Sequence, residues 1–189
     1  MKKASPRLGH SEVEYLLPQM LDRFAKEFAA ADAEMKMVDS MYKSDKESVP
    51  AGAVFQARDR RIETGVLLLL VASARLEQII YHYAVTFLDA DSFKEHLERN
   101  QLLSKWLLLP RLCQGKQVEE DHPAITSLKE LIKARNSVAH PKRYDLVSNV
   151  FQQKTKKEIG RFVSACRKAK STVDALIKIL ETPSSCVST

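Results

Sequence analysis

The chain has 189 residues, of which 44% are hydrophobic and 29% are charged, and its net charge is +6 at pH 7. This length allows one domain with a buried core, and the composition is typical of a soluble globular protein rather than a low-complexity chain. Three cysteines without a Cys-x-x-Cys pair support neither a disulfide framework nor a zinc site, and they fit a reducing cytosol.

The start of the chain lacks the apolar core of a signal peptide, so we expect a cytoplasmic protein. The longest apolar run, from Gly65 to Ala74, is closed by Arg75 and is too short to span a bilayer. We therefore expect a buried helix there and no membrane contact. Residues 1–10 and 182–189 are predicted to be flexible tails of a single helical domain that covers residues 11–181.

Two long helices are predicted in the first half of the chain. Ser11 and Glu14 have capping-box spacing, and apolar residues then recur every three or four positions to about Tyr42. Pro18 must either kink this helix or lie in the first turn of a new one. After a polar loop over residues 44–57, a second helix is predicted from about residue 58 to residue 88. It is apolar nearly all round, which predicts a central position in a bundle.

A third helix is predicted from Ser92 to about Leu109, with Leu103 and Leu107 on its apolar face and Pro110 ending it. The acidic run at residues 119–122 lies in the following loop. Consecutive acids in a loop are more often solvated than metal-bound, so we predict no metal site there.

Pro123 fits the first position of the next helix, which should run to about His140. A non-helical stretch is expected to Lys154, and Thr155 opens a last helix that ends at Glu181. No segment shows the alternation of a strand, so the predicted class is all-α, a bundle of about five helices.

The helix over residues 123–140 ends in an unusual group of polar residues. Arg135 falls on an otherwise apolar helical stripe, where a charge is costly unless something pairs with it. Asn136 and His140 are four residues apart and share a neighbouring face. Taken singly, Arg135 could close a buried ion pair, and Asn136 and His140 could be helix caps. Together they indicate a polar site.

The second helix offers two carboxylates that could neutralise Arg135. Glu63 and Glu77 interrupt its apolar surface, and either could supply the counter-charge. The alternative is that both are ordinary exposed residues.

The segment Arg135-Asn136-x-x-x-His140 resembles the signature of the HEPN family, an Arg and a polar residue followed by a His. An all-helical chain with a long apolar helix upstream fits this resemblance, which covers the organisation of residues 62–181. It implies a helical bundle that dimerises and a metal-independent endoribonuclease without a cofactor, in which two motifs meet across the dimer. It also implies a defence or toxin–antitoxin setting, in which the protein partner would be an antitoxin.

The residue chemistry is compatible with that activity. An imidazole such as His140 titrates near neutral pH and can transfer protons. Arg135 can bind a phosphate through two contacts and stabilise charge on it, and Asn136 can orient the imidazole or donate to a phosphate oxygen. RNA supplies its own nucleophile, the 2′-hydroxyl.

The excess positive charge lies just after the motif. Residues 142–170 hold nine Lys or Arg and two acids, a net +7, whereas the whole chain carries +6. We expect Lys142 and Arg143 to bind RNA, and Lys154 to Lys170 to form a solvated face.

Other chemistries have less support. The sequence lacks a phosphate-binding loop, a dinucleotide fingerprint, a zinc-protease motif and a nucleophile elbow. A catalytic Cys–His pair is an alternative that the sequence leaves open, although a free Cys is more often a small buried hydrophobe. The alternative functions are a non-catalytic helical module that binds RNA, a nucleotide or a partner protein, and a purely structural dimerisation protein.

Overall fold

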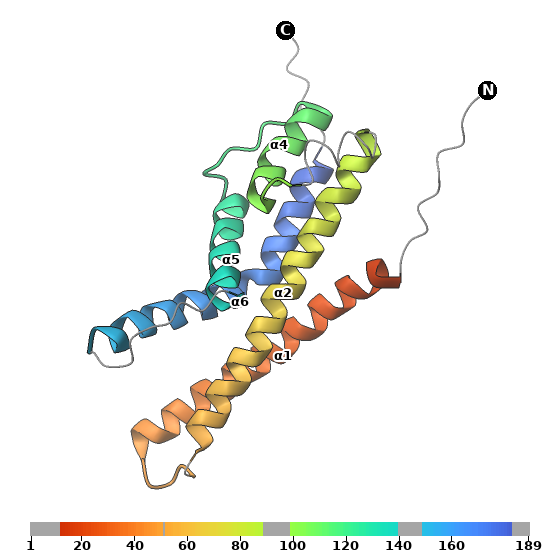
Figure 1. Ribbon diagram of the computed structural model, residues 1–189. Coiled ribbons are helices and arrows are strands. Elements are labelled where there is room, and N and C mark those ends of the chain that lie inside the picture. Colours follow the sequence, from red (N-terminus) through yellow and green to blue (C-terminus); the bar gives the residue numbers. More distant parts are fainter. Residues whose placement is uncertain (1–11, 51, 89–98, 140–148, 183–189) are drawn as a thin grey trace, which may run out of the picture.

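The computed structural model describes residues 12–50, 52–88, 99–139 and 149–182, in which all regular structure is helical. The side chains of residues 12–14, 138–139 and 149–155 are not described. The all-α prediction of about five helices is confirmed, and Figure 1 shows the arrangement. The helices are α1 (Glu12–Ser44), α2 (Ala53–Phe87), α4 (Leu102–Gln114), α5 (Pro123–Ala139) and α6 (Asn149–Glu181).

Helices α1 and α2 form a long hairpin and lie side by side (Figure 1). Pro18 lies inside α1, so the alternative that it sits in the first turn of a new helix is wrong. Gly52 adopts a φ of +91°, a left-handed conformation that glycine reaches without steric cost, and α2 starts directly after it. The helix therefore begins five residues before the predicted start at residue 58.

Helix α2 is the centre of the bundle, as its apolar circumference predicted. It packs against α1, α4, α5 and α6, and its residues Ala72, Leu76 and Ile80 are fully buried. Among the described helices, α2 alone has the length and hydropathy that would suit a bilayer, with a mean hydropathy of 1.4 over its most apolar window. Within the bundle, 44% of that window is buried against the rest of the protein.

Helix α4 differs from its predicted form at both ends. Ser92 lies outside the described residues, but Arg99 and Asn100 form a turn and bend, so α4 cannot be continuous from residue 92. The prediction that Pro110 ends the helix is wrong as well. The chain continues for one more turn to Gly115, whose φ is +68° and whose N–H donates to the Arg111 carbonyl. This left-handed glycine is the usual end of a helix.

The shifted start of α4 also changes which of its residues reach the core. The buried residues are Leu102, Lys105, Trp106, Leu109 and Pro110, while the predicted face residues Leu103 and Leu107 are only partly buried.

Helix α5 confirms the prediction that Pro123 opens it, and it ends at Ala139. The Ala124 N–H donates to Nδ1 of His122, 3.2 Å away, so a loop histidine caps the helix. Helix α6 begins at Asn149, six residues before the predicted Thr155, because the capping-box spacing there lies inside a longer helix. Helix α6 packs against α1, α2 and α5, which joins the two ends of the chain in one core.

Candidate functional site

The motif residues Arg135 and Asn136 lie near the end of α5 and contact each other. Nε and Nη2 of Arg135 both donate to Oδ1 of Asn136, at 3.2 and 2.9 Å. Arg135 is half-buried and Asn136 is exposed. No carboxylate of the described residues forms an ion pair with Arg135. The guanidinium is therefore held in place by a neutral amide.

The expected counter-charge for Arg135 is not supplied by α2. Glu77 binds Lys105 of α4 instead, with 2.9 Å between its Oε2 and Nζ of Lys105. Glu63 is exposed, as the alternative interpretation expected. A buried ion pair of Arg135 with Glu77 is therefore excluded in this conformation.

The remaining predicted site residues, His140, Lys142 and Arg143, lie outside the described residues. The structure thus brings together Arg135 and Asn136 of the predicted set. The position of the imidazole relative to the guanidinium stays a prediction.

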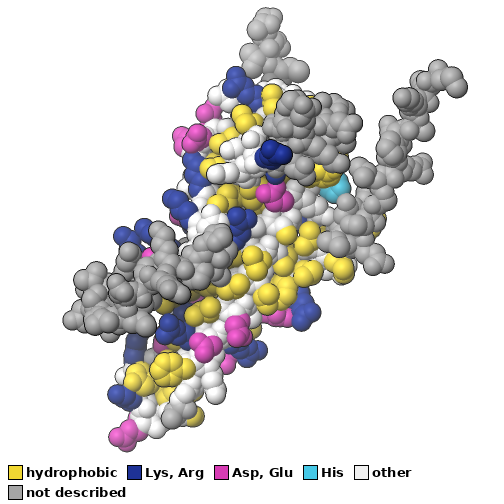
Figure 2. Space-filling model, viewed as in Figure 1, with side chains coloured by type: hydrophobic (Ala, Val, Ile, Leu, Met, Phe, Trp, Pro, Cys, Tyr) yellow, Lys and Arg dark blue, Asp and Glu magenta, His cyan; other side chains and the backbone are white. Residues whose placement is uncertain are grey.

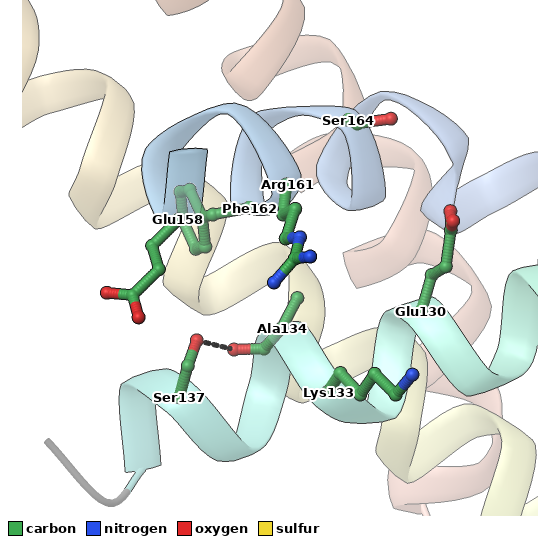
Figure 3. A pocket seen from close by; sticks show the side chains of 8 residues that line it. All are labelled: Glu130, Lys133, Ala134, Ser137, Glu158, Arg161, Phe162 and Ser164. Atoms are coloured by element: carbon green, nitrogen blue, oxygen red, sulfur yellow. Dashed lines mark hydrogen bonds between the residues drawn. The ribbon is translucent and has the colours of Figure 1, made fainter. Parts of the chain in front are cut away.

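A groove of about 460 Å³ lies between α5 and α6 (Figure 3). Arg161 reaches from α6 into the space between the helices, with Glu158 on one side of it and Glu130 on the other. Phe162 contributes its ring, and the Ser137 hydroxyl donates to the Ala134 carbonyl at 2.7 Å. The eight lining residues are Glu130, Lys133, Ala134, Ser137, Glu158, Arg161, Phe162 and Ser164.

Two cations of this groove have no acidic partner in the described part of the chain. Glu130 is paired with Lys168 at 3.6 Å, whereas Lys133 and Arg161 are exposed and form no ion pair with a described carboxylate. A phosphate group could bind there without displacing an acid.

The groove and the motif use different sides of α5. Residues in a helix advance by about 100° each, so Lys133, Ala134 and Ser137 share one face. Arg135 falls on the opposite side, next to the core stripe of Leu128 and Leu131, and it does not line the groove. Sequence reasoning missed Lys133 and assigned Arg161 to a solvated face. The i, i+4 spacing of Lys133 and Ser137 was the available signal, but the facing helix was unknown.

A second charged cluster joins α1, α2 and α6 around Asp32. Its carboxylate is buried and accepts hydrogen bonds from Nε and Nη2 of Arg167 at 2.9 and 3.0 Å. Lys36 lies 3.2 Å away and Arg61 lies 3.6 Å away. Burial by itself would raise the pKa of Asp32, but the hydrogen bonds from Arg167 and Lys36 outweigh it and hold this pKa below its ordinary value. Sequence reasoning missed this cluster because Arg61 and Arg167 are far from Asp32 in the chain.

The described thiols are poor nucleophiles. Burial, with the nearby charge of Asp32, raises the pKa of Cys166 to about 12, and its Sγ donates to the Gly65 carbonyl at 3.6 Å. Burial also raises the pKa of Cys113. A protonated thiol at neutral pH is unreactive, so the Cys–His interpretation loses support for these two residues. No three metal-ligating side chains come together in residues 12–50, 52–88, 99–139 and 149–182.

Comparison of the chain with protein-family models, with curated proteins and with solved structures finds no match. Any functional assignment therefore rests on the motif and on the geometry around it.

Proposed function

We propose that this chain is a HEPN-like, metal-independent endoribonuclease that acts as a homodimer, with Arg135, Asn136 and His140 in its site. The observation that carries this proposal is the state of Arg135. An arginine in an ion pair would have to leave its carboxylate before it could bind a phosphate. Among the described residues, the neutral Oδ1 of Asn136 holds Arg135 and no carboxylate pairs with it, so its charge is available to a phosphate.

In the proposed reaction, the 2′-hydroxyl of the RNA attacks the adjacent phosphorus. His140 accepts the proton of this hydroxyl, or donates one to the departing 5′-oxygen, and the His140 of a second copy performs the other transfer. Arg135 stabilises the charge that develops on the phosphate, and Asn136 keeps the guanidinium oriented. The products are a 2′,3′-cyclic phosphate and a 5′-hydroxyl. Lys142 and Arg143 bind the flanking backbone in this proposal.

The dimer in this proposal is supported by exposed apolar side chains on the α1–α2 hairpin. Leu67 and Leu70 of α2 are 44% and 47% exposed and lie one turn apart, and Leu16 and Met20 of α1 are also exposed. Figure 2 shows hydrophobic side chains gathered along this hairpin. Large exposed apolar patches usually mark a protein interface, and we propose a second copy as the occupant.

The second candidate function is a non-catalytic module that binds RNA or a protein such as an antitoxin. The observation that favours this second candidate is the α5–α6 groove, because its cations have no acidic partner among the described residues and Arg135 does not line it, so an anion could bind there without the motif.

The test is RNA cleavage by the purified full-length protein in EDTA. The wild type is compared with His140→Ala, Arg135→Ala and the matched control Arg111→Ala, which removes an exposed arginine of α4. We expect the wild type and the control to leave 2′,3′-cyclic ends. Loss of a proton-transfer group or of a transition-state cation should lower the rate by roughly 100-fold or more. Circular dichroism and sedimentation check that each variant is folded and dimeric.

Two results would contradict the proposal. If the wild type binds RNA without cutting it, the catalytic proposal fails and the non-catalytic binding module remains as the function. A fully active Arg135→Ala variant would show that the motif is not the site. A Leu70→Lys variant tests the dimer, because a composite site should lose cleavage in parallel with dimerisation.

A further inference from the structure

The groove between α5 and α6 has the size and the wall of a ligand site. Its volume of about 460 Å³ falls within the range of roughly 300–1,000 Å³ that is usual for small-molecule pockets. Phe162 and Ala134 give it an apolar floor, and both are buried, so their positions are fixed by the core. The hydroxyls of Ser137 and Ser164 and the carboxylates of Glu130 and Glu158 line the rest.

The lining of the groove is balanced, with Lys133 and Arg161 against Glu130 and Glu158, and Lys168 and Lys157 on α6 add the positive charge that favours an anion. Lys133 and Arg161 approach it from opposite helices, and neither is neutralised by a described acid. Lys157 lies one turn before Arg161 on α6 and is also exposed without a described acidic partner. Glu130 is already paired with Lys168, so the acid on this side is occupied. An incoming phosphate would gain two cations from two helices.

A phosphate site beside an apolar floor matches one nucleotide. Single-stranded RNA exposes flat base faces and a charged backbone together, and proteins bind it by combining basic side chains with an apolar or aromatic surface. Serine hydroxyls and a carboxylate at the rim can accept hydrogen bonds from the polar edge of a base. A free inorganic anion would leave the apolar floor unused.

The groove lies at nearly the same level of α5 as the motif but on the other side of the helix. Lys133 precedes Asn136 by three residues, which is about 4.5 Å of helical rise. We propose that the α5–α6 groove is a subsite for a nucleotide of single-stranded RNA at a distance along the strand from the cleaved one, with Lys133 and Arg161 holding its phosphate and Phe162 supporting its base. This inference rests on the proposed function, because it takes RNA as the substrate. It assigns the positioning of the RNA strand to residues that lie outside the motif.

The experiment separates binding from cleavage. A His140→Ala protein, which should not cut, is titrated with a fluorescently labelled single-stranded RNA at several salt concentrations. Lys133→Gln and Arg161→Gln are added singly and together. The matched controls are Lys129→Gln, an α5 cation already paired with Glu120, and Arg111→Gln. Cleavage is measured in parallel with the same substitutions in the wild-type background.

We expect each groove substitution to weaken binding about threefold to tenfold and to reduce the slope of log affinity against log salt by about 0.7, as for one lost phosphate contact to a single strand. The double variant should lose about twice that slope, and the controls should match the parent protein. Phe162→Leu should weaken binding without changing the slope, because it removes an uncharged contact. The groove substitutions should also slow cleavage, most strongly at low RNA concentration.

The outcomes distinguish the two proposals. If the double variant has the same RNA affinity and the same salt dependence as its parent while the wild type cleaves RNA, the groove inference fails and the proposed function stands. If the wild type does not cleave but binding depends on Lys133 and Arg161, the catalytic proposal fails and the groove stands. If the wild type binds no RNA, both are wrong.

Discussion

Gly65 allows α2 and α6 to approach each other closely. A Cβ atom at this position would lie 2.6 Å from Cζ and 2.9 Å from Cε1 of Phe162, and 3.1 Å from Sγ of Cys166. Glycine inside a helix costs about 1 kcal/mol relative to alanine, so its use here is explained by packing rather than by helix propensity. Phe162 also lines the α5–α6 groove, which makes Gly65 a determinant of the groove's floor.

Gly65→Ala should therefore destabilise the protein in spite of its higher helix propensity. The added methyl group must push the Phe162 ring toward the groove, and overpacking of this kind costs about 1–3 kcal/mol. Gly160→Ala is the matched control, because its added Cβ would meet no described atom within 4 Å beyond the neighbouring backbone of α6, and it should stabilise by up to about 1 kcal/mol. Urea unfolding measures both, and equal stabilisation by the two substitutions would refute the close approach.

At the scale of the helices, most of the fold could be predicted because apolar residues recur at helical spacing along each helix. The errors lie at the ends, where single residues were given too much weight. Pro110 was expected to stop α4, but Gly115 ends it one turn later. Thr155 was expected to start α6, but the helix already begins at Asn149. Proline and capping residues act locally, and the packing of a whole helix can override them.

The sequence predicts the part of the candidate site that lies on one helix, and it does not predict the parts that several helices build together. Arg135 and Asn136 lie on one helix, so their proximity follows from the sequence alone. The groove needs Lys133 and Arg161 from two helices, and the Asp32 cluster needs three helices. Such contacts depend on how the helices pack, which periodicity does not determine.

The ion pair of Glu77 and Lys105 fixes α4 against α2. The Lys105 side chain is 10% exposed and the Glu77 side chain is 41% exposed, so the two ends of the pair differ in their access to water. A buried ammonium that loses its partner keeps the full cost of its desolvation. A half-exposed carboxylate that loses its partner can be hydrated.

We therefore predict unequal effects of removing the two partners. Glu77→Ala should lower the free energy of unfolding by about 3 kcal/mol, because it leaves Lys105 buried without a counter-charge. Lys105→Met keeps the volume and removes the buried charge, so it should cost less than about 1 kcal/mol or even stabilise. A double-mutant cycle by chemical denaturation checks this, and equal losses for the two single variants would show that Lys105 reaches water.

At the scale of the whole molecule, Asp32 connects the first and last helices of the chain. Its carboxylate on α1 binds Arg167 on α6 and lies near Arg61 on α2, and the side chain is only 6% exposed. Nε of Arg61 is buried and has no hydrogen-bond partner among the described residues, so this arginine depends on Asp32 for its compensation. The bundle therefore contains one acid whose ionisation bears on the packing of three helices.

The pKa of Asp32 is lower in the folded protein than its ordinary value of 3.8, so ionised Asp32 stabilises the fold. This contribution is complete above the ordinary pKa and is lost as the pH falls through the folded pKa. We expect stability to fall below about pH 4, and Asp32→Asn to remove that part of the pH dependence.

At neutral pH, Asp32→Asn should cost about 3 kcal/mol, the low end for a broken buried pair, because Arg167 and Lys36 can turn toward water. Asp22→Asn is the matched control, since Asp22 pairs with Lys170 at the surface between the same two helices. Thermal unfolding from pH 3 to pH 7 measures the effect, and the same acid sensitivity in Asp32→Asn and the wild type would assign it to other carboxylates.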